Sequence, residues 1–256
     1  MTSWLFFAGI ITRNGHWRTL KALPSRAIVV SLAMGVVNPA LYYLLLFSAF
    51  DRLPAQEAMA INYTWAIAQP LLAAPLLNQK LRPQELLAAL VSYSGVFVIA
   101  THGDPLGFSV SDPMGLVMAI ASTIIWALFW IANTANTLDP VIRLFLNFCG
   151  ATPVLIALTL MSGGFNNLGW QGIAGGIYIG LFEMGLSFVL WLSALRLTSS
   201  TVRLSTLVFL SPPLSLMIIW LVLDEPILAA TAVGLVMILA GLSLQHLRLP
   251  QRNQTR

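Results

Sequence analysis

The chain has 256 residues, of which 58% are hydrophobic and only 9% are charged. Because a soluble domain carries about 25% charged residues, this composition excludes a soluble globular protein and indicates a chain embedded in the lipid bilayer. The formal net charge of +4 does not indicate a nucleic-acid partner, since no basic run is interleaved with aromatic residues. The single cysteine, Cys149, excludes an intrachain disulfide, and the few scattered histidines and carboxylates lead us to predict no metal site and no cofactor.

The first 26 residues differ from the rest of the chain. Ser3–Thr12 is apolar but, at ten residues, too short to span a membrane, and a basic loop begins at Arg13. A signal peptide would carry its basic residues before the apolar stretch, so this segment is a poor match to one. We interpret residues 1–26 as an N-terminal helix fragment, whose first half is missing, followed by a cytoplasmic basic loop.

Eight later segments have about the 20 apolar residues that a spanning helix needs, or nearly so. Short loops with turn residues separate them. Lipid admits only helices or closed barrels, and continuous apolar runs favour helices. The sequence therefore predicts an all-α integral membrane protein, a polytopic helix bundle. Its predicted spans are Ala27–Phe50, Ala55–Leu77, Glu85–Ala100, Met114–Ala132, Val141–Met161, Trp170–Leu195, Thr201–Leu223 and Ile227–Leu247.

The basic residues alternate between successive loops. Twelve of the thirteen Lys and Arg residues lie in every second loop, and Arg52 is the only base in the loops between them. Translocation retains Lys and Arg on the cytoplasmic side of a membrane, so the alternation predicts a multi-pass protein with a cytoplasmic C-terminus. The cytoplasmic set is Arg13, Arg18, Lys21, Arg26, Lys80, Arg82, Arg143, Arg196, Arg203, Arg248, Arg252 and Arg256.

Two stretches of the chain, one beginning at Met34 and one at Ile179, resemble each other. The charge pattern places the loop at Asp51 outside and its counterpart at Arg196 inside, so the two copies are predicted to be inverted repeats. In transporters built this way, the substrate site lies between the repeats. The identities at one common offset are Gly35 with Gly180, Leu41 with Leu186, Leu45 with Leu190, Ser48 with Ser193, and Ala49 with Ala194.

Two further motifs point to a family. Pro213 is followed by Glu225 and then by Gly234 and Gly241. In the first half, the sequence INYTWAIAQPLLAAPLLNQK contains an Asn-Tyr-x-Trp run and a later Gln-Lys. With these motifs the chain resembles the drug/metabolite transporter superfamily, in its ten-helix branch of two EamA-type repeats, and its first half resembles the aromatic amino acid exporters of that superfamily.

The resemblance implies the organisation of the chain. Residues 27–104 would form the first EamA-type repeat, which is incomplete because the first helix is apparently missing. Residues 105–247 would form the second repeat, and residues 248–256 the cytoplasmic tail. The family implies transport without ATP in the bacterial inner membrane, often export of amino acids or metabolites. Gly234 and Gly241, seven residues apart, are expected to mark a packing face of the last helix, which would serve either an intramolecular contact or a homodimer.

Glu183 is the only charged residue deep inside an apolar span. A charge at that depth costs about 3 kcal/mol or more, so it needs a partner, a proton or a cavity. Gly172, Gly176 and Gly180 recur every four residues and predict a close helix–helix face. At about 100° per residue, Glu183 falls on that face and is predicted to point into the protein. The alternative is a protonated carboxyl bonded to a neighbouring helix, without a role in transport.

Polar and aromatic residues at helical spacing mark three other faces. Amide groups in hydrocarbon need partners, so these faces are expected to turn inward and line a cavity with aromatic walls, suited to a small amphipathic substrate. For the tryptophans the alternative is ordinary packing or an interfacial belt. The predicted substrate-binding residues are Asn38, Tyr42, Asn62, Trp65, Gln69, Trp126, Trp130 and Glu183.

The sequence thus predicts a secondary transporter that exports a small amphipathic metabolite, such as an amino acid, by alternating access. Its partners would be the small-molecule substrate and the lipid bilayer. No catalytic residues are predicted, because no acid–base pair is evident and the histidines lie in loops or at a span end. Two alternatives remain open, an integral membrane enzyme acting on lipid and an inactive, truncated transporter paralogue.

Overall fold

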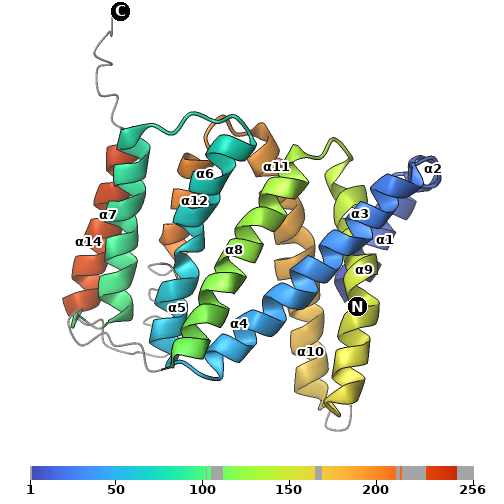
Figure 1. The fold of residues 1–256 in the computed structure, drawn as a ribbon, viewed down its shortest axis with the longest axis horizontal. Helices are drawn as coiled ribbons and strands as arrows, with labels where there is room; N and C mark the ends of the chain where they lie inside the picture. Colours follow the sequence, from blue (N-terminus) through green and yellow to red (C-terminus); the bar gives the residue numbers. More distant parts are fainter. Residues whose placement is uncertain are drawn as a thin grey trace, which may run out of the picture. The chain divides into compact units, whose positions relative to one another are not determined.

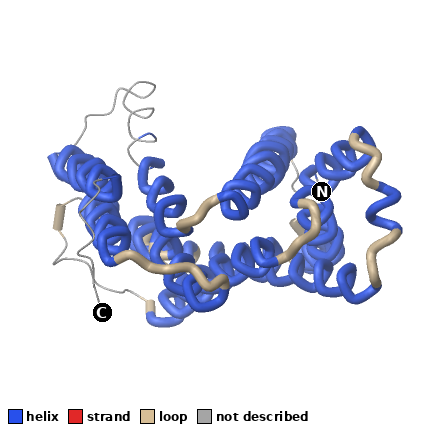
Figure 2. Tube along the Cα trace, turned by 90° about the horizontal axis from the view of Figure 1, so that it is seen from above, coloured by secondary structure: helices blue, strands red, loops and turns tan. Residues whose placement is uncertain are grey.

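The computed structural model of the chain describes residues 2–101, 103–104, 112–164, 169–211, 214 and 229–246. Within these ranges the chain forms helices joined by loops, without strands (Figure 2). Two compact units can be distinguished. The first comprises Met1–Asp51 and Val117–Thr198, and the second Arg52–Leu116 and Ser199–Arg256. Each unit therefore combines segments from both halves of the sequence, and the repeat boundaries at residues 104 and 105 stay a prediction.

The first unit holds the N-terminal helices and most of the middle of the chain (Figure 1). Its elements are α1 (Thr2–Arg13), α2 (Trp17–Lys21), α3 (Ser25–Gly35), η1 (Val36–Leu41), α4 (Tyr42–Phe50), α8 (Pro113–Ala135) from Val117 onward, α9 (Pro140–Met161), α10 (Trp170–Tyr178), η2 (Ile179–Ser187) and α11 (Phe188–Leu197). The second unit holds α5 (Ala55–Tyr63), α6 (Trp65–Leu76), α7 (Pro83–Ala100), the start of α8, α12 (Thr201–Thr206), η3 (Leu207–Leu210) and α14 (Ala229–His246).

Five helical stretches of the described residues are long and apolar enough to cross a membrane. They are Ser25–Phe50, Pro83–Ala100, Pro113–Ala135, Pro140–Met161 and Trp170–Leu197. They coincide with five of the predicted spans, and the prediction of an all-α, polytopic membrane protein is confirmed. The inverted orientation of the repeats and the missing first helix stay predictions.

The remaining predicted spans differ from the structure or leave the described part of the chain. The span Ala55–Leu77 is two helices, α5 and α6, joined at Thr64, whose hydroxyl donates a hydrogen bond to the Ile61 carbonyl oxygen at 2.6 Å. Residues 212–213 and 215–228 of the last two spans lie outside the described residues, as does Leu247. The described remainder contains the shorter apolar helices Thr201–Leu210 and Ala232–Leu244.

In the second unit, α7 and α14 lie side by side in close contact (Figure 1). A methyl group added at Gly234 would lie 2.5 Å from the carbonyl oxygen of Gly95, and one added at Gly95 would lie 2.5 Å from that of Gly234. Gly241 packs in the same way against Ser92 and Ala88. The face of Gly234 and Gly241 is therefore covered by α7 of the same chain. The intramolecular contact, one of the two expected uses of this face, is therefore present, because small residues there let two helices of one chain approach closely. The homodimer stays a prediction.

The first unit contains a comparable crossing of α3 and α9, where Gly35 and Gly150 contact the backbone of the opposite helix. Next to it Arg143, in the first turn of α9, is almost completely buried. Its Nε donates to Asn133 Oδ1 at 2.8 Å, and its Nη1 donates to the hydroxyl of Ser31 on α3. A buried guanidinium needs such acceptors, so this network ties α3, α8 and α9 together.

The start of α8 is anchored to the loop before α5 within the second unit. Asp112 Oδ1 accepts hydrogen bonds from the backbone N–H groups of Gly115 and Met114, and its Oδ2 lies 3.3 Å from Arg52 Nη1. The Gly115 N–H and the Arg52 guanidinium lower the pKa of Asp112. Arg52, the one base outside the predicted cytoplasmic loops, is thus paired with a carboxylate.

Candidate substrate-binding site

Two of the membrane-spanning stretches of the first unit depart from α-helical geometry in their middle. Between α3 and α4, Asn38 has the extended backbone angles φ −149° and ψ 124° and interrupts the helix just before Pro39. Between α10 and α11, the nine residues of η2 form a π-helix. Discontinuous helices leave backbone and side-chain polar groups available at mid-membrane depth, and in many transporters they form the substrate site. π-Helical turns are likewise frequent at functional sites.

The two irregular segments occupy equivalent places in the two similar stretches of sequence. In the sequence alignment that matches Gly35 with Gly180, Asn38 is aligned with Glu183. Each irregular segment therefore carries one side chain that is an amide or a carboxylate, and the two occupy the same position of the repeat. The matching places of Asn38 and Glu183 make these two residues the natural centre of a candidate site.

Glu183 lies in η2, and its Oε1 accepts a hydrogen bond of 3.0 Å from the hydroxyl of Tyr43 on α4. Glu183 is exposed but contacts Tyr43 of another helix, so the prediction that it points into the protein and not into lipid stays a prediction. At Gly172 and Gly176 an added methyl group would meet nothing within 4 Å in the described part of the chain, whereas Gly180 packs against Thr2 of α1. The close helix–helix face predicted from the glycine spacing is therefore not formed at Gly172 and Gly176 within the described residues.

Tyr43 leads from Glu183 into a cluster of aromatic rings, all within the first unit. Its ring centroid lies 4.8 Å from that of Tyr42, which lies 4.6 Å from that of Trp126. Trp126 contacts Trp130 at 5.6 Å, and both tryptophans contact Phe188 at 5.7 and 5.0 Å. Most of these pairs are tilted or edge-to-face, the arrangement that the ring quadrupoles favour. The predicted residues Tyr42, Trp126 and Trp130 are thus brought together in one aromatic wall next to a carboxylate.

Two fully buried side chains of this unit, Asn38 and Trp130, have polar groups without a partner among the described residues. The side chain of Asn38 is fully buried, and neither its amide nitrogen nor its oxygen makes a hydrogen bond to any described residue. The indole N–H of Trp130, also fully buried, is unpaired within the same residues. An unsatisfied buried polar group costs about 1–3 kcal/mol. Such groups need an explanation in water or in a ligand that is bound at times.

The other predicted residues belong to the second unit. Asn62 lies at the end of α5 and is half-buried, and its side-chain nitrogen has no partner in the described residues. Trp65 and Gln69 lie on α6 and are buried. Beside them, the hydroxyl groups of Tyr63 and Ser211 are 3.0 Å apart. These three residues therefore lie in the second unit, whereas the aromatic wall belongs to the first.

Sequence reasoning missed Tyr43 and Phe188, which connect the predicted residues. Tyr43 directly follows the predicted Tyr42, and a helical-face argument assigns adjacent residues to different faces. Phe188 is an apolar residue in an apolar span, and no local signal distinguishes it. The pairing of Asn38 with Glu183 is present in the repeat alignment, where it could have been read directly.

With this geometry in hand, comparison with known proteins gives a consistent result. The profile of the family described as EamA-like transporter family matches residues 1–101 and 113–245. A solved crystal structure superposes with a TM-score of 0.77 at 22% sequence identity, covering 96% of this chain and 84% of the other, and so shows the same fold.

Individual relatives are more distant. The chain is 28% identical over 153 residues to the aromatic amino acid exporter YddG of Ancylobacter novellus, a match that covers 59% of this chain and 53% of the exporter. It is 27% identical over 216 residues to the protein PecM of Dickeya dadantii, covering 82% of this chain and 70% of PecM. An uncharacterized transporter of Archaeoglobus fulgidus is 25% identical over 233 residues, with coverages of 89% and 80%. The match to the exporter thus spans about half of that protein's length.

Proposed function

This chain belongs to the EamA-like transporter family, and on that premise we propose that it is a secondary transporter that exports a small amphipathic metabolite, such as an amino acid, by alternating access. It is a membrane transporter by family. The export of amino acids is suggested by the similarity to an aromatic amino acid exporter. We take the bacterial inner membrane as its location, with the C-terminus in the cytoplasm, because the basic residues alternate between loops.

The observation that carries the proposal is the pair of interrupted membrane-spanning stretches with Asn38 and Glu183 at equivalent places. A zwitterionic substrate needs a negative group for its amine and a hydrogen-bond donor for its carboxylate. Glu183 supplies the first, held by the Tyr43 hydroxyl at 3.0 Å. The unpaired amide of Asn38 and the indole N–H of Trp130 are donors without partners in the described residues.

The aromatic wall would bind the apolar part of the substrate. Tyr42, Trp126 and Trp130 present ring faces and edges next to Tyr43. Pockets for small organic molecules are mostly apolar with a few placed polar groups, and this is the composition of the proposed site. Asn62, Trp65 and Gln69 of the second unit are proposed to contribute to substrate binding as well.

A transporter is preferred here over an enzyme acting on lipid. The family and the relatives named as transporters support this choice. An enzyme would bring together acids, bases or metal ligands, whereas the proposed site combines one carboxylate with phenol, indole and amide groups. The proposed role of Glu183 is therefore recognition of the substrate amine or carriage of a coupling proton.

The test is transport in proteoliposomes with a panel of amino acids and other small amphipathic metabolites. Glu183→Gln keeps the shape of the side chain and removes its charge, and we expect transport to fall at least tenfold, which corresponds to about 1.4 kcal/mol. Tyr43→Phe removes only the hydroxyl that holds Glu183 and should lower transport about tenfold, because hydrogen bonds to charged groups contribute about 1.5–3 kcal/mol.

Tyr178→Phe is the matched control, since Tyr178 lies on α10 with 65% of its surface exposed. It should transport within twofold of the wild type. If Glu183 carries a coupling proton, wild-type transport should fall in acid. That fall should be absent from the residual transport of Glu183→Gln. Wild-type rates in both Glu183→Gln and Tyr43→Phe, or a wild type that transports no compound of the panel, would refute the proposal.

A further inference from the structure

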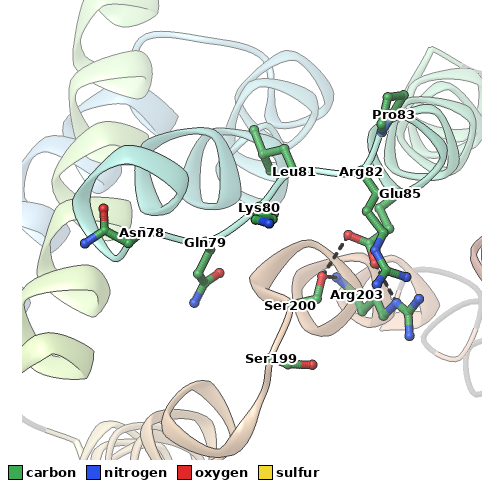
Figure 3. Close-up of a pocket in the computed structure, with 10 residues that line it drawn as sticks. All are labelled: Asn78, Gln79, Lys80, Leu81, Arg82, Pro83, Glu85, Ser199, Ser200 and Arg203. Atoms are coloured by element: carbon green, nitrogen blue, oxygen red, sulfur yellow. Dashed lines mark hydrogen bonds and ion pairs between the residues drawn. The ribbon is translucent and has the colours of Figure 1, made fainter. Parts of the chain in front are cut away.

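A cavity of about 610 Å³ opens in the second unit (Figure 3). It lies where loop 77–82, which joins α6 to α7, meets the residues that precede α12. Its volume is in the range of small-ligand sites. The lining residues that matter for its chemistry are Gln79, Lys80, Arg82, Glu85, Ser200 and Arg203.

The cavity has an excess of positive charge. Glu85 is buried, and its Oε1 lies 2.7 Å from Arg203 Nε, while its Oε2 accepts a hydrogen bond of 3.0 Å from the Ser200 hydroxyl (Figure 3). The single carboxylate of the lining is thus already satisfied. Lys80 and Arg82 are exposed and form no ion pair with any described residue. Two cations remain uncompensated, so the cavity is suited to an anion.

Neutral donors accompany these cations. The side-chain oxygen of Gln79 accepts a hydrogen bond of 3.2 Å from the backbone N–H of Thr201, which leaves the Gln79 NH₂ group as a donor. The hydroxyl of Ser199 also lines the cavity. A phosphate group accepts several hydrogen bonds in addition to carrying charge, and a mixture of Lys, Arg, amide and hydroxyl donors matches both properties.

The surroundings of the cavity are apolar and lie at the end of a membrane-spanning helix. Leu81 and Pro83 contribute to its lining, and α7 starts at Pro83. On the adjoining surface, Leu76 of α6 is 56% exposed and Leu87 of α7 is 53% exposed. Because α7 is long and apolar enough to cross a membrane, we expect the cavity at its start to lie at the level of the lipid headgroups. The cations would then face the headgroup of a phospholipid and the exposed leucines its acyl chains.

We propose that this cavity binds the phosphate group of an anionic phospholipid from the leaflet that contains loop 77–82. Lys80 and Arg82 bind the phosphate, Gln79 and Ser199 bind headgroup oxygens, and the acyl chains lie along the exposed leucines of α6 and α7. Basic pockets between membrane helices are known to bind anionic headgroups in this way. The inference does not depend on the proposed transport function.

Lipid binding to the full chain, purified in detergent, tests the proposal. Native mass spectrometry or a fluorescent-lipid titration would compare phosphatidylglycerol with phosphatidylcholine. The double variant Lys80→Gln/Arg82→Gln should bind phosphatidylglycerol at least tenfold more weakly than the wild type, with unchanged thermal unfolding because both side chains are exposed. Arg203 is left in place, since its removal would leave Glu85 buried without its partner.

The matched control is Lys21→Gln/Arg26→Gln, which removes the same charge from two exposed residues of the first unit. It should bind phosphatidylglycerol within twofold of the wild type. Inorganic phosphate and glycerol phosphate test whether a soluble phosphate is the ligand, and both should compete only weakly with phosphatidylglycerol. The proposal is overturned if the two double variants lose affinity equally, if Lys80→Gln/Arg82→Gln binds like the wild type, or if a soluble phosphate binds as tightly as the lipid.

Discussion

The contact between Gly95 on α7 and Gly234 on α14 allows a quantitative prediction. In Gly234→Ala the new methyl group would stand 2.5 Å from the Gly95 carbonyl oxygen and 2.5 Å from Ile99 Cγ1, whereas ordinary contact begins near 3.4 Å. The two helices would have to separate by about 0.9 Å. Such overpacking costs about 1–3 kcal/mol. Alanine recovers about 0.5–1 kcal/mol through its better helix propensity, so we expect a net loss of about 1 kcal/mol and at most about 2.5 kcal/mol.

Reversible unfolding in mixed micelles, followed by circular dichroism, measures this loss. Gly95→Ala should cost about the same, because its methyl group would meet the Gly234 carbonyl oxygen at the same distance. The double variant should cost less than the sum by about 1 kcal/mol, since one separation of the helices accommodates both methyl groups. Gly172→Ala, which meets nothing within 4 Å of its added methyl group among the described residues, is the control and should not destabilise the protein.

Two results would refute this reasoning about the α7–α14 contact. The first is a Gly234→Ala variant as stable as the Gly172→Ala control. The second is a Gly234→Ala variant whose only change is in oligomeric state, measured by light scattering. Such a result would show that the Gly234 face makes a contact between chains.

Three further predictions concern other parts of the chain. Asn38→Asp should lower the free energy of unfolding by about 2–3 kcal/mol at pH 7, measured as above, because it places a carboxyl group in a fully buried site without a donor among the described residues. Asp112→Asn should lower stability at neutral pH. Since folding lowers the pKa of Asp112, its contribution is present above its usual pKa near 4 and is lost as the pH falls through the lower folded value. The deficit of the variant should therefore vanish in acid, whereas a pH-independent deficit would contradict this. Reporter fusions after Leu81 and Arg256 should read cytoplasmic and one after Asp104 periplasmic, and a periplasmic reading at Arg256 would overturn the predicted orientation.

The sequence sufficed for five of the eight predicted spans, because continuous apolar runs and the bilayer leave little choice of structure. It did not suffice for the interruptions within them. Pro39 marks the break at Asn38, since proline lacks a backbone donor. No such residue marks η2, which contains only Gly180 and Gly185 as candidates for irregularity. The orientation predicted for Glu183 assumes a regular α-helix, and η2 departs from that geometry.

Glycine spacing was similarly ambiguous. Gly172 and Gly176, four residues apart, form the pattern usually associated with helix contacts, yet an added methyl group at either meets nothing within 4 Å in the described residues. Gly234 and Gly241, seven apart, pack closely against α7. A small residue permits close approach without requiring it, and the partner helix must be supplied by the rest of the fold.

The different side chains at Asn38 and Glu183 follow from their surroundings. Position 183 is exposed and receives the Tyr43 hydroxyl, so a carboxylate there keeps a donor. Position 38 is fully buried, and a carboxylate there would be desolvated without compensation. A neutral amide is the most polar group that position 38 accepts at a moderate cost in desolvation free energy. The two predicted repeats can therefore hold a charged group on one stretch and a neutral donor on the other, and this asymmetry fits the proposed substrate, which has two unlike polar ends.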